Sequence, residues 1–69
     1  MTDTVGDALP REMTRVRDQV LPPYLEIGPA GALAVAMMRQ SLDRAQKAMM
    51  EGDVVTMIAC LKDLKEWQL

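Results

Sequence analysis

Residues 49–57, MMEGDVVTM, decide the fold, because an ending signal for one helix is followed directly by a starting signal for the next. Gly52 can take the left-handed backbone conformation that often ends a helix. Asp53 belongs to the residue types that favour the N-cap position of a new helix. Two helices joined by so short a connection lie antiparallel, so we expect a helical hairpin that turns at residues 51–53.

Apolar residues recur at intervals of three and four on both sides of this turn. The pattern before the turn predicts a helix over residues 29–50, and the pattern after it predicts a helix over residues 54–67. We expect the two apolar stripes to form the core of the hairpin or a dimer contact. The stripe residues are Val35, Leu42, Ala45, Met49, Val54, Met57, Ile58, Leu61 and Leu64.

Residues 9–21, LPREMTRVRDQVL, predict a first, shorter helix with one apolar stripe. Pro10 suits the start of this helix. Two further prolines, at positions 22 and 23, are expected to end it, because the residue before a proline avoids the helical region. Residues 22–31 then form a connector along the surface of a helix, with a turn at Gly28. Residues 1–8 lack periodicity and are expected to be a mobile tail before a single domain of residues 9–69.

The stretch GPAGALAVAMM, residues 28–38, would be apolar around the whole circumference of a helix. Such a helix must be covered on several sides, and a chain of 69 residues has few elements to cover it. Chains of this size lie just below the length at which one core is comfortably stable, so a second copy or a partner is expected to contribute. We therefore predict an all-α fold, a short N-terminal helix plus an antiparallel helical hairpin, assembled as a homodimeric helical bundle.

The composition argues against several classes of function. A net charge of −2 does not provide the basic face that a nucleic-acid binder needs. The N-terminal residues do not resemble a signal peptide, and the apolar run is about half of the ~20 residues that a membrane span requires. A single cysteine suits a reducing compartment, so we expect a soluble cytoplasmic protein without direct contact to nucleic acid or membrane.

Groups that could carry chemistry are few. The chain has no histidine, the usual proton-transfer group near neutral pH. Cys60 lies inside an apolar stripe without a basic partner, so we interpret it as a core residue. Ser41 has no partner base, and GPAG lacks the lysine and the preceding strand of a phosphate loop. One cysteine and scattered carboxylates give no metal site. We expect neither catalysis nor a cofactor, and redox chemistry at Cys60 is the alternative.

Seven methionines are a high count for this length, and four of them form the pairs 37–38 and 49–50. Neighbouring side chains on a helix point about 100° apart, so one member of each pair is expected to face away from the core. Methionine is flexible and recurs on surfaces that bind varied partners, although it also fills cores. We predict a partner surface that consists of Tyr24, Leu33, Met37, Met38 and Arg39. Three arginines, at positions 11, 15 and 17, either solvate the first helix or contact an acidic partner.

The connector LPPYLEIGPAG (21–31), the helix ALAVAMMRQSLDRAQKAMM (32–50) and the hairpin segment EGDVVTMIACLKDLK (51–65) resemble a family of small phage proteins. These are the anti-quorum-sensing anti-activators of bacteriophages that infect pseudomonads. The resemblance implies a tiny, all-helical, dimeric inhibitor in the host bacterial cytoplasm. It implies binding to the DNA-binding domain of a LuxR-type transcription activator, and a second target, the ATPase that drives type IV pilus assembly.

The resemblance agrees with a physical argument. Blocking a DNA-reading helix requires only an apolar patch with a few charges, and a basic domain attracts a mildly acidic binder. Two alternatives remain open: a structural module for homo-oligomerisation, and a helix over residues 29–50 that binds a membrane surface. The mixed charges of that helix argue against the membrane.

Overall fold

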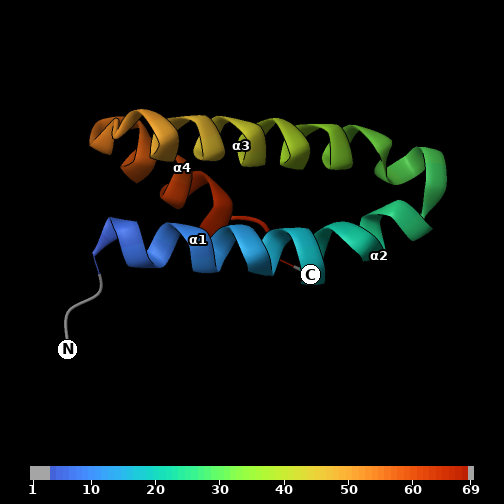
Figure 1. Cartoon of the computed structure of the whole chain (residues 1–69). Helices are drawn as coiled ribbons and strands as arrows, with labels where there is room; N and C mark the ends of the chain where they lie inside the picture. Colours follow the sequence, from blue (N-terminus) through green and yellow to red (C-terminus); the bar gives the residue numbers. More distant parts are fainter. Residues whose placement is uncertain (1–3, 69) are drawn as a thin grey trace.

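The computed structural model describes residues 4–68, and every element in this range is helical. The elements are α1 (Val5–Arg15), the π-helical segment η1 (Val16–Val20), α2 (Leu21–Glu26), the 3-10 segment η2 (Gly28–Gly31), α3 (Ala32–Glu51) and α4 (Val54–Lys65). The all-α prediction is confirmed. The first three elements follow one another without a break, and we call residues 5–26 the N-terminal rod. The rod and α3 run antiparallel, and α4 crosses behind both (Figure 1).

The predicted hairpin is present, with its turn where the sequence places it. Gly52 adopts the left-handed conformation, with φ 67° and ψ 26°, and its N–H donates to carbonyl groups of the last turn of α3. The carboxylate of Asp53 accepts from the backbone N–H of Thr56 at 3.2 Å and from its hydroxyl at 2.6 Å. These bonds satisfy backbone groups that a helix terminus otherwise leaves open, so the turn is fixed by local chemistry.

The start of the rod differs from the prediction. Thr4 caps the helix: its hydroxyl oxygen accepts from the N–H of Asp7 at 3.2 Å, and the Asp7 carboxylate accepts from the N–H of Thr4. This reciprocal pair is a capping box. The mobile tail predicted over residues 1–8 is therefore wrong for residues 4–8, and residues 1–3 lie outside the described part. Pro10 stands inside α1 rather than at its start.

The two consecutive prolines were predicted to end a helix over residues 9–21 and to begin a connector over residues 22–31. This prediction is wrong, because the prolines do not end the rod. Proline lacks an N–H and its ring crowds the carbonyl four residues earlier. The wide π turn of η1 meets this constraint, because the N–H of Leu21 bonds to the carbonyl of Val16, five residues back. Pro22 and Pro23 then occupy the first positions of α2, where no intrahelical donor is needed. The rod continues to Glu26, and the predicted turn at Gly28 follows, with φ 69°.

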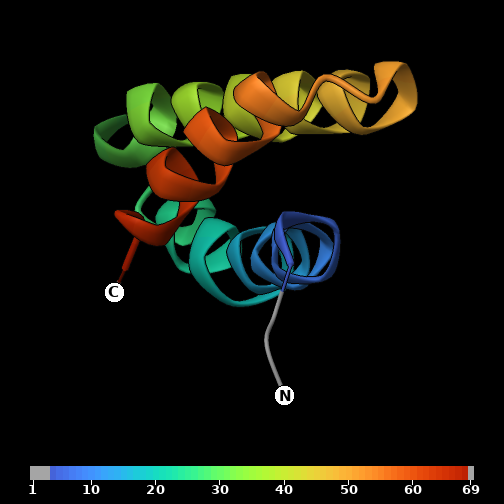
Figure 2. The same cartoon turned by 90° about the vertical axis from the view of Figure 1, so that its left-hand side faces the viewer.

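The core lies where α4 contacts both the rod and α3 (Figure 2). On α3, Val35 and Ala45 of the predicted stripe are buried, and Leu42 and Met49 lie at its partly buried edge. On α4 the predicted stripe is partly wrong, because Val54 and Ile58 are exposed. The helix α4 lies between the rod and α3. Its buried face therefore consists of the side chains that point into the space between these two elements. The buried hydrophobic residues of α3 and α4 are Val35, Met38, Ala45, Ala48, Met57, Cys60 and Leu64.

Polar contacts fix α4 against both neighbours. Arg15 on the rod donates from Nη2 to the carbonyl of Leu64 at 3.0 Å, and its Nε donates to Glu12 at 3.2 Å. On the other side the hydroxyl of Ser41 donates to the carboxylate of Asp63 at 2.5 Å. Arg15 therefore links the rod to the last turn of α4, where the carbonyl of Leu64 also accepts from the backbone N–H of Trp67 at 3.2 Å.

The bend between the rod and α3 depends on a glycine. A Cβ at Gly31 would overlap the carbonyl oxygen of Tyr24 and come within 3.1 Å of the Ile27 side chain. We expect Gly31→Ala to lower the free energy of unfolding by about 1–3 kcal/mol or more, because backbone atoms must move apart. Urea denaturation followed by far-UV circular dichroism measures this. The matched control is Gly6→Ala, where a Cβ meets only an ordinary contact at 3.6 Å. Equal stability of the two variants would contradict the close approach.

Candidate functional site

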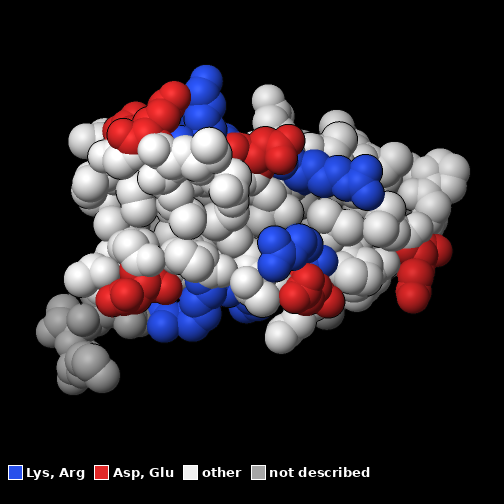
Figure 3. Space-filling model, viewed as in Figure 1, with Lys and Arg blue, Asp and Glu red and all other residues white. Residues whose placement is uncertain are grey.

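The side of the molecule opposite α4 carries a groove between the rod and α3, which we call the central groove. It has a volume of about 410 Å³. Figure 3 looks onto this side and shows basic and acidic side chains along an otherwise uncharged surface. The residues that line the central groove are Met13, Arg17, Leu21, Arg39, Leu42, Asp43 and Gln46.

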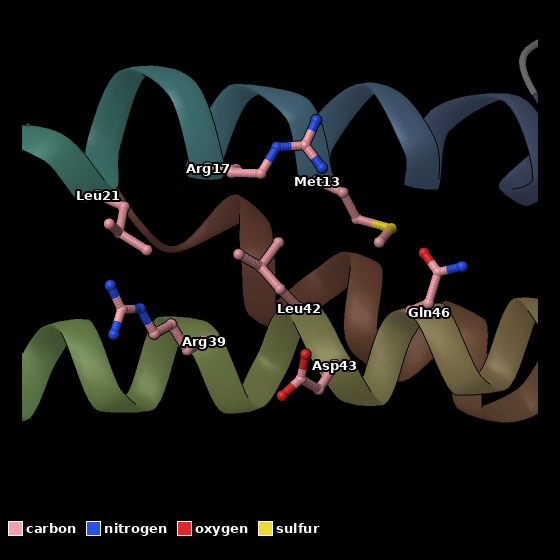
Figure 4. A pocket seen from close by; sticks show the side chains of 7 residues that line it. All are labelled: Met13, Arg17, Leu21, Arg39, Leu42, Asp43 and Gln46. Carbon is pink, nitrogen blue, oxygen red and sulfur yellow. The ribbon is translucent and has the colours of Figure 1, made fainter.

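The central groove combines an apolar lining with polar ends of side chains. Met13 and Leu21 extend from the rod toward α3, and Leu42 extends from α3 toward the rod (Figure 4). Arg39 and Gln46 also point from α3 into the space between the helices, one on each side of Leu42. These positions follow from the helical repeat, because residues three or four apart share one face of α3.

The two arginines of the groove differ in their partners. Arg17 forms an exposed ion pair with the neighbouring Asp18, with 3.3 Å between Nε and Oδ1. Arg39 forms no hydrogen bond or ion pair with any residue that the structure describes. An exposed pair of adjacent residues is worth little, so both guanidinium groups are available to a ligand in the groove.

A second hollow, which we call the bend pocket, adjoins the first at Arg39 and has a volume of about 350 Å³. Tyr24 forms one of its walls and packs edge-on against Trp67, with ring centroids 6.3 Å apart and an interplanar angle of 82°. Such a pair orients both rings, so Tyr24 ties the C-terminal end of the chain to the bend. The lining residues of the bend pocket are Tyr24, Leu25, Gly28, Ala32, Val35, Ala36 and Arg39.

Large hydrophobic side chains are exposed near the bend. We call Leu25, Ile27, Leu33 and Met37 the bend patch; all four are about half exposed or more, and Leu33 reaches 73%. Leu33 and Met37 lie one helical turn apart and therefore share a face of α3. Of the predicted partner residues, these two lie in the bend patch, while Tyr24 and Arg39 meet in the bend pocket.

The fifth predicted partner residue is wrong. Met38 has no exposed surface and belongs to the core, whereas its neighbour Met37 is 49% exposed. Each methionine pair was expected to divide between core and surface, and here the division follows the α3 stripe. A partner cannot contact Met38 without unfolding the helix around it.

A further group of exposed hydrophobic residues lies around the α3–α4 turn. We call Met50, Val54, Val55 and Ile58 the hairpin patch. Sequence reasoning missed it, because it assigned Val54 and Ile58 to the hairpin core. The signal that could have found it is that positions 54, 55, 57, 58, 60, 61 and 64 are all apolar, which is more than one helix face can bury.

The alternative of redox chemistry at Cys60 depends on the state of its thiol. Cys60 is buried, and burial raises the pKa of its thiol, which disfavours the reactive thiolate. Within residues 4–68 no group of three or more carboxylate or thiol side chains is placed to hold a metal ion. None of the described helices combines the length and the hydrophobicity that a membrane crossing requires.

Comparisons of the chain with models of protein families, with curated proteins and with solved structures find no match. Residues 4–68 form a small all-α fold that carries the central groove, the bend pocket, the bend patch and the hairpin patch. Its function is therefore inferred from these surfaces.

The methionine pair gives a matched test of the burial. Met38→Ala is expected to lower the free energy of unfolding by about 2–5 kcal/mol, because it leaves a cavity in the core. Met37→Ala removes the same atoms from an exposed position and is expected to change the free energy of unfolding by less than about 0.5 kcal/mol. Urea denaturation of the two variants measures the difference. A similar decrease in the free energy of unfolding for both variants would show that the face of α3 toward the core is assigned wrongly.

The state of Cys60 can be measured by alkylation. We expect iodoacetamide to modify the folded protein at least about tenfold more slowly than the urea-unfolded chain, since both burial and the raised pKa reduce the thiolate available. Mass spectrometry follows the reaction. Modification of the folded protein at the rate of the unfolded chain would contradict the buried position and reopen a redox role.

Proposed function

We propose that this chain is a binding protein that acts by covering a surface of another protein, without chemistry of its own. The observation that carries the proposal is the bend patch. Four large hydrophobic side chains stand exposed within residues 25–37. Exposed apolar patches of this kind mark interaction sites, and this one surrounds the bend at which Gly31 approaches the carbonyl of Tyr24.

The segment that carries the bend patch has acidic side chains between two flanking arginines. Residues 18–38 contain Asp18, which pairs with Arg17, and Glu26, but no lysine or arginine, and Arg39 in the adjoining bend pocket follows directly. Complementary charge steers and selects partners, and a DNA-reading domain is basic because it contacts phosphates. This agrees with the target that the resemblance implies.

We therefore propose a phage-encoded inhibitor in the host bacterial cytoplasm, which binds the DNA-binding domain of a LuxR-type activator and blocks its access to DNA. The pilus assembly ATPase is proposed as a second target on the resemblance alone.

The hairpin patch favours a second proposal, self-association into a homodimer. Glu51 and Asp53 flank the N-terminal end of α4, and its last turns carry Lys62 and Lys65 together with Asp63, which bonds to Ser41, and Glu66. When two copies of α4 pair antiparallel about a two-fold axis, Glu51 and Asp53 of each copy lie toward Lys62 and Lys65 of the other. The exposed side chains of Val55 and Ile58 would lie between these charges. A purely structural oligomerisation module is the alternative function that this patch supports.

Two matched substitutions separate these roles. Leu33→Glu and Val55→Glu each place a carboxylate at a helical position that is 73% and 80% exposed, respectively, so both variants are expected to fold. We expect Leu33→Glu to weaken binding to a purified LuxR-type DNA-binding domain at least about tenfold, as at an interface hot spot. Val55→Glu is expected to keep that affinity and to lose self-association.

Isothermal titration calorimetry measures the affinity, and sedimentation equilibrium measures the oligomeric state. A gel-shift assay with operator DNA then tests whether the bound domain is released from DNA. Undiminished affinity of the Leu33→Glu variant would refute the placement at the bend patch. If the native protein only self-associates and binds no such domain, the structural module is the better account.

A further inference from the structure

The central groove has the shape of an unfilled position in a helical bundle. The rod and α3 run antiparallel along its two sides, and α4 runs behind it (Figures 2 and 4). α4 crosses obliquely behind the groove, so the rod and α3 leave between them an open two-helix face along which a further helix can pack. We infer that the central groove docks an amphipathic helix of a partner protein, with carboxylates of that helix placed between Arg17 and Arg39.

The length of the hollow surface suits a helix. The central groove and the bend pocket share Arg39, so their common lining follows α3 from Ala32 to Gln46. At 1.5 Å per residue this stretch measures about 21 Å, which accommodates about four turns of a docked helix. An apolar groove of this length binds a helix through residues spaced three and four apart.

The lining selects an amphipathic occupant. Met13, Leu21 and Leu42 offer apolar surface along the middle of the groove and would cover the apolar stripe of the docked helix. Arg17 and Arg39 stand on opposite walls, one on the rod and one on α3. Docking would remove both guanidinium groups from water, and carboxylates on the incoming helix restore their hydrogen bonds.

The charge of this site differs from that of the bend patch. The central groove presents two arginines and one carboxylate, Asp43, which lies one turn along α3 from Arg39. A basic helix would meet like charge at Arg17 and Arg39, whereas the bend patch lies in a segment without basic residues. The inference therefore goes beyond the proposed function: the groove accepts an acidic helix, whereas the bend patch, which shares Leu25 with the bend pocket, is proposed to bind a basic domain.

Three fluorescein-labelled peptides of about 18 residues provide the probes. The first is a helical amphipathic peptide with a leucine stripe flanked by glutamates, the second carries lysine in place of each glutamate, and the third is a scrambled form of the first. Fluorescence anisotropy at about 50 mM salt measures binding to the full chain. We expect the glutamate peptide to bind at least about tenfold more tightly than either of the others.

A charge reversal on the protein tests the role of the groove. Arg39→Glu is expected to weaken binding of the glutamate peptide at least about tenfold and to strengthen binding of the lysine peptide. The matched control is Arg44→Glu, on the same helix but outside the groove lining, which is expected to leave both affinities within about twofold. Amide chemical shifts of Leu21, Leu42 and Gln46 are expected to move on binding, and those around Ile58 are not.

Several results would overturn the inference. Equal affinity for the glutamate and lysine peptides, failure of all three to bind, or shifts confined to the hairpin patch would each do so. A monomeric Arg39→Glu variant of an otherwise dimeric protein would assign the groove to a second copy of the chain instead. The peptides contain no sequence from a transcription activator. Failure of the glutamate peptide to bind would therefore not refute the proposed binding of a basic domain at the bend patch. Failure of that domain to bind would likewise not affect the peptide test of the central groove.

Discussion

The packing of α4 between the rod and α3 is the interaction on which the rest of the structure depends. Leu64 and Cys60 are almost fully buried at this contact, and the rod meets α3 directly mainly where α2 lies beside it. Without α4 the long apolar faces of the rod and α3 would have no common neighbour. Because α4 lies on one side only, the opposite side stays open, and the central groove follows from having three helices rather than four.

The bend sets the second feature of the surface. The π turn of η1 carries the rod past two prolines, and Gly31 lets the chain return close to the backbone of Tyr24. So tight a return leaves no room for a side chain at position 31, and around it Leu25, Ile27 and Leu33 stay about half exposed or more. The exposed patch therefore lies at the bend that brings α3 back along the rod.

The sequence predicted the features that local chemistry controls. Gly52 and Asp53 define the hairpin by their own conformational and hydrogen-bonding preferences, and the stripe of α3 follows from its spacing alone.

Prediction failed where non-local packing decided the outcome. Prolines 22 and 23 end most helices, but here a widened turn retains the helix because the apolar side chains on both sides of it are buried together. The face of α4 could not be assigned, since 54, 57, 58, 60, 61 and 64 are all apolar and only the position of the rod selects among them. For the same reason Met37 and Met38 could not be told apart by residue type.

Our central claim is that the bend is a binding surface for a basic protein domain. Hydrogen–deuterium exchange on the complex with a purified LuxR-type DNA-binding domain tests it most directly, because it maps the contact without any substitution. Relative to the free protein, we expect slower exchange in residues 21–37 of the complex. We expect the exchange of residues 54–58 to be the same in the complex and in the free protein. Protection confined to α4, or no added protection anywhere at saturating concentrations of the domain, would contradict the claim.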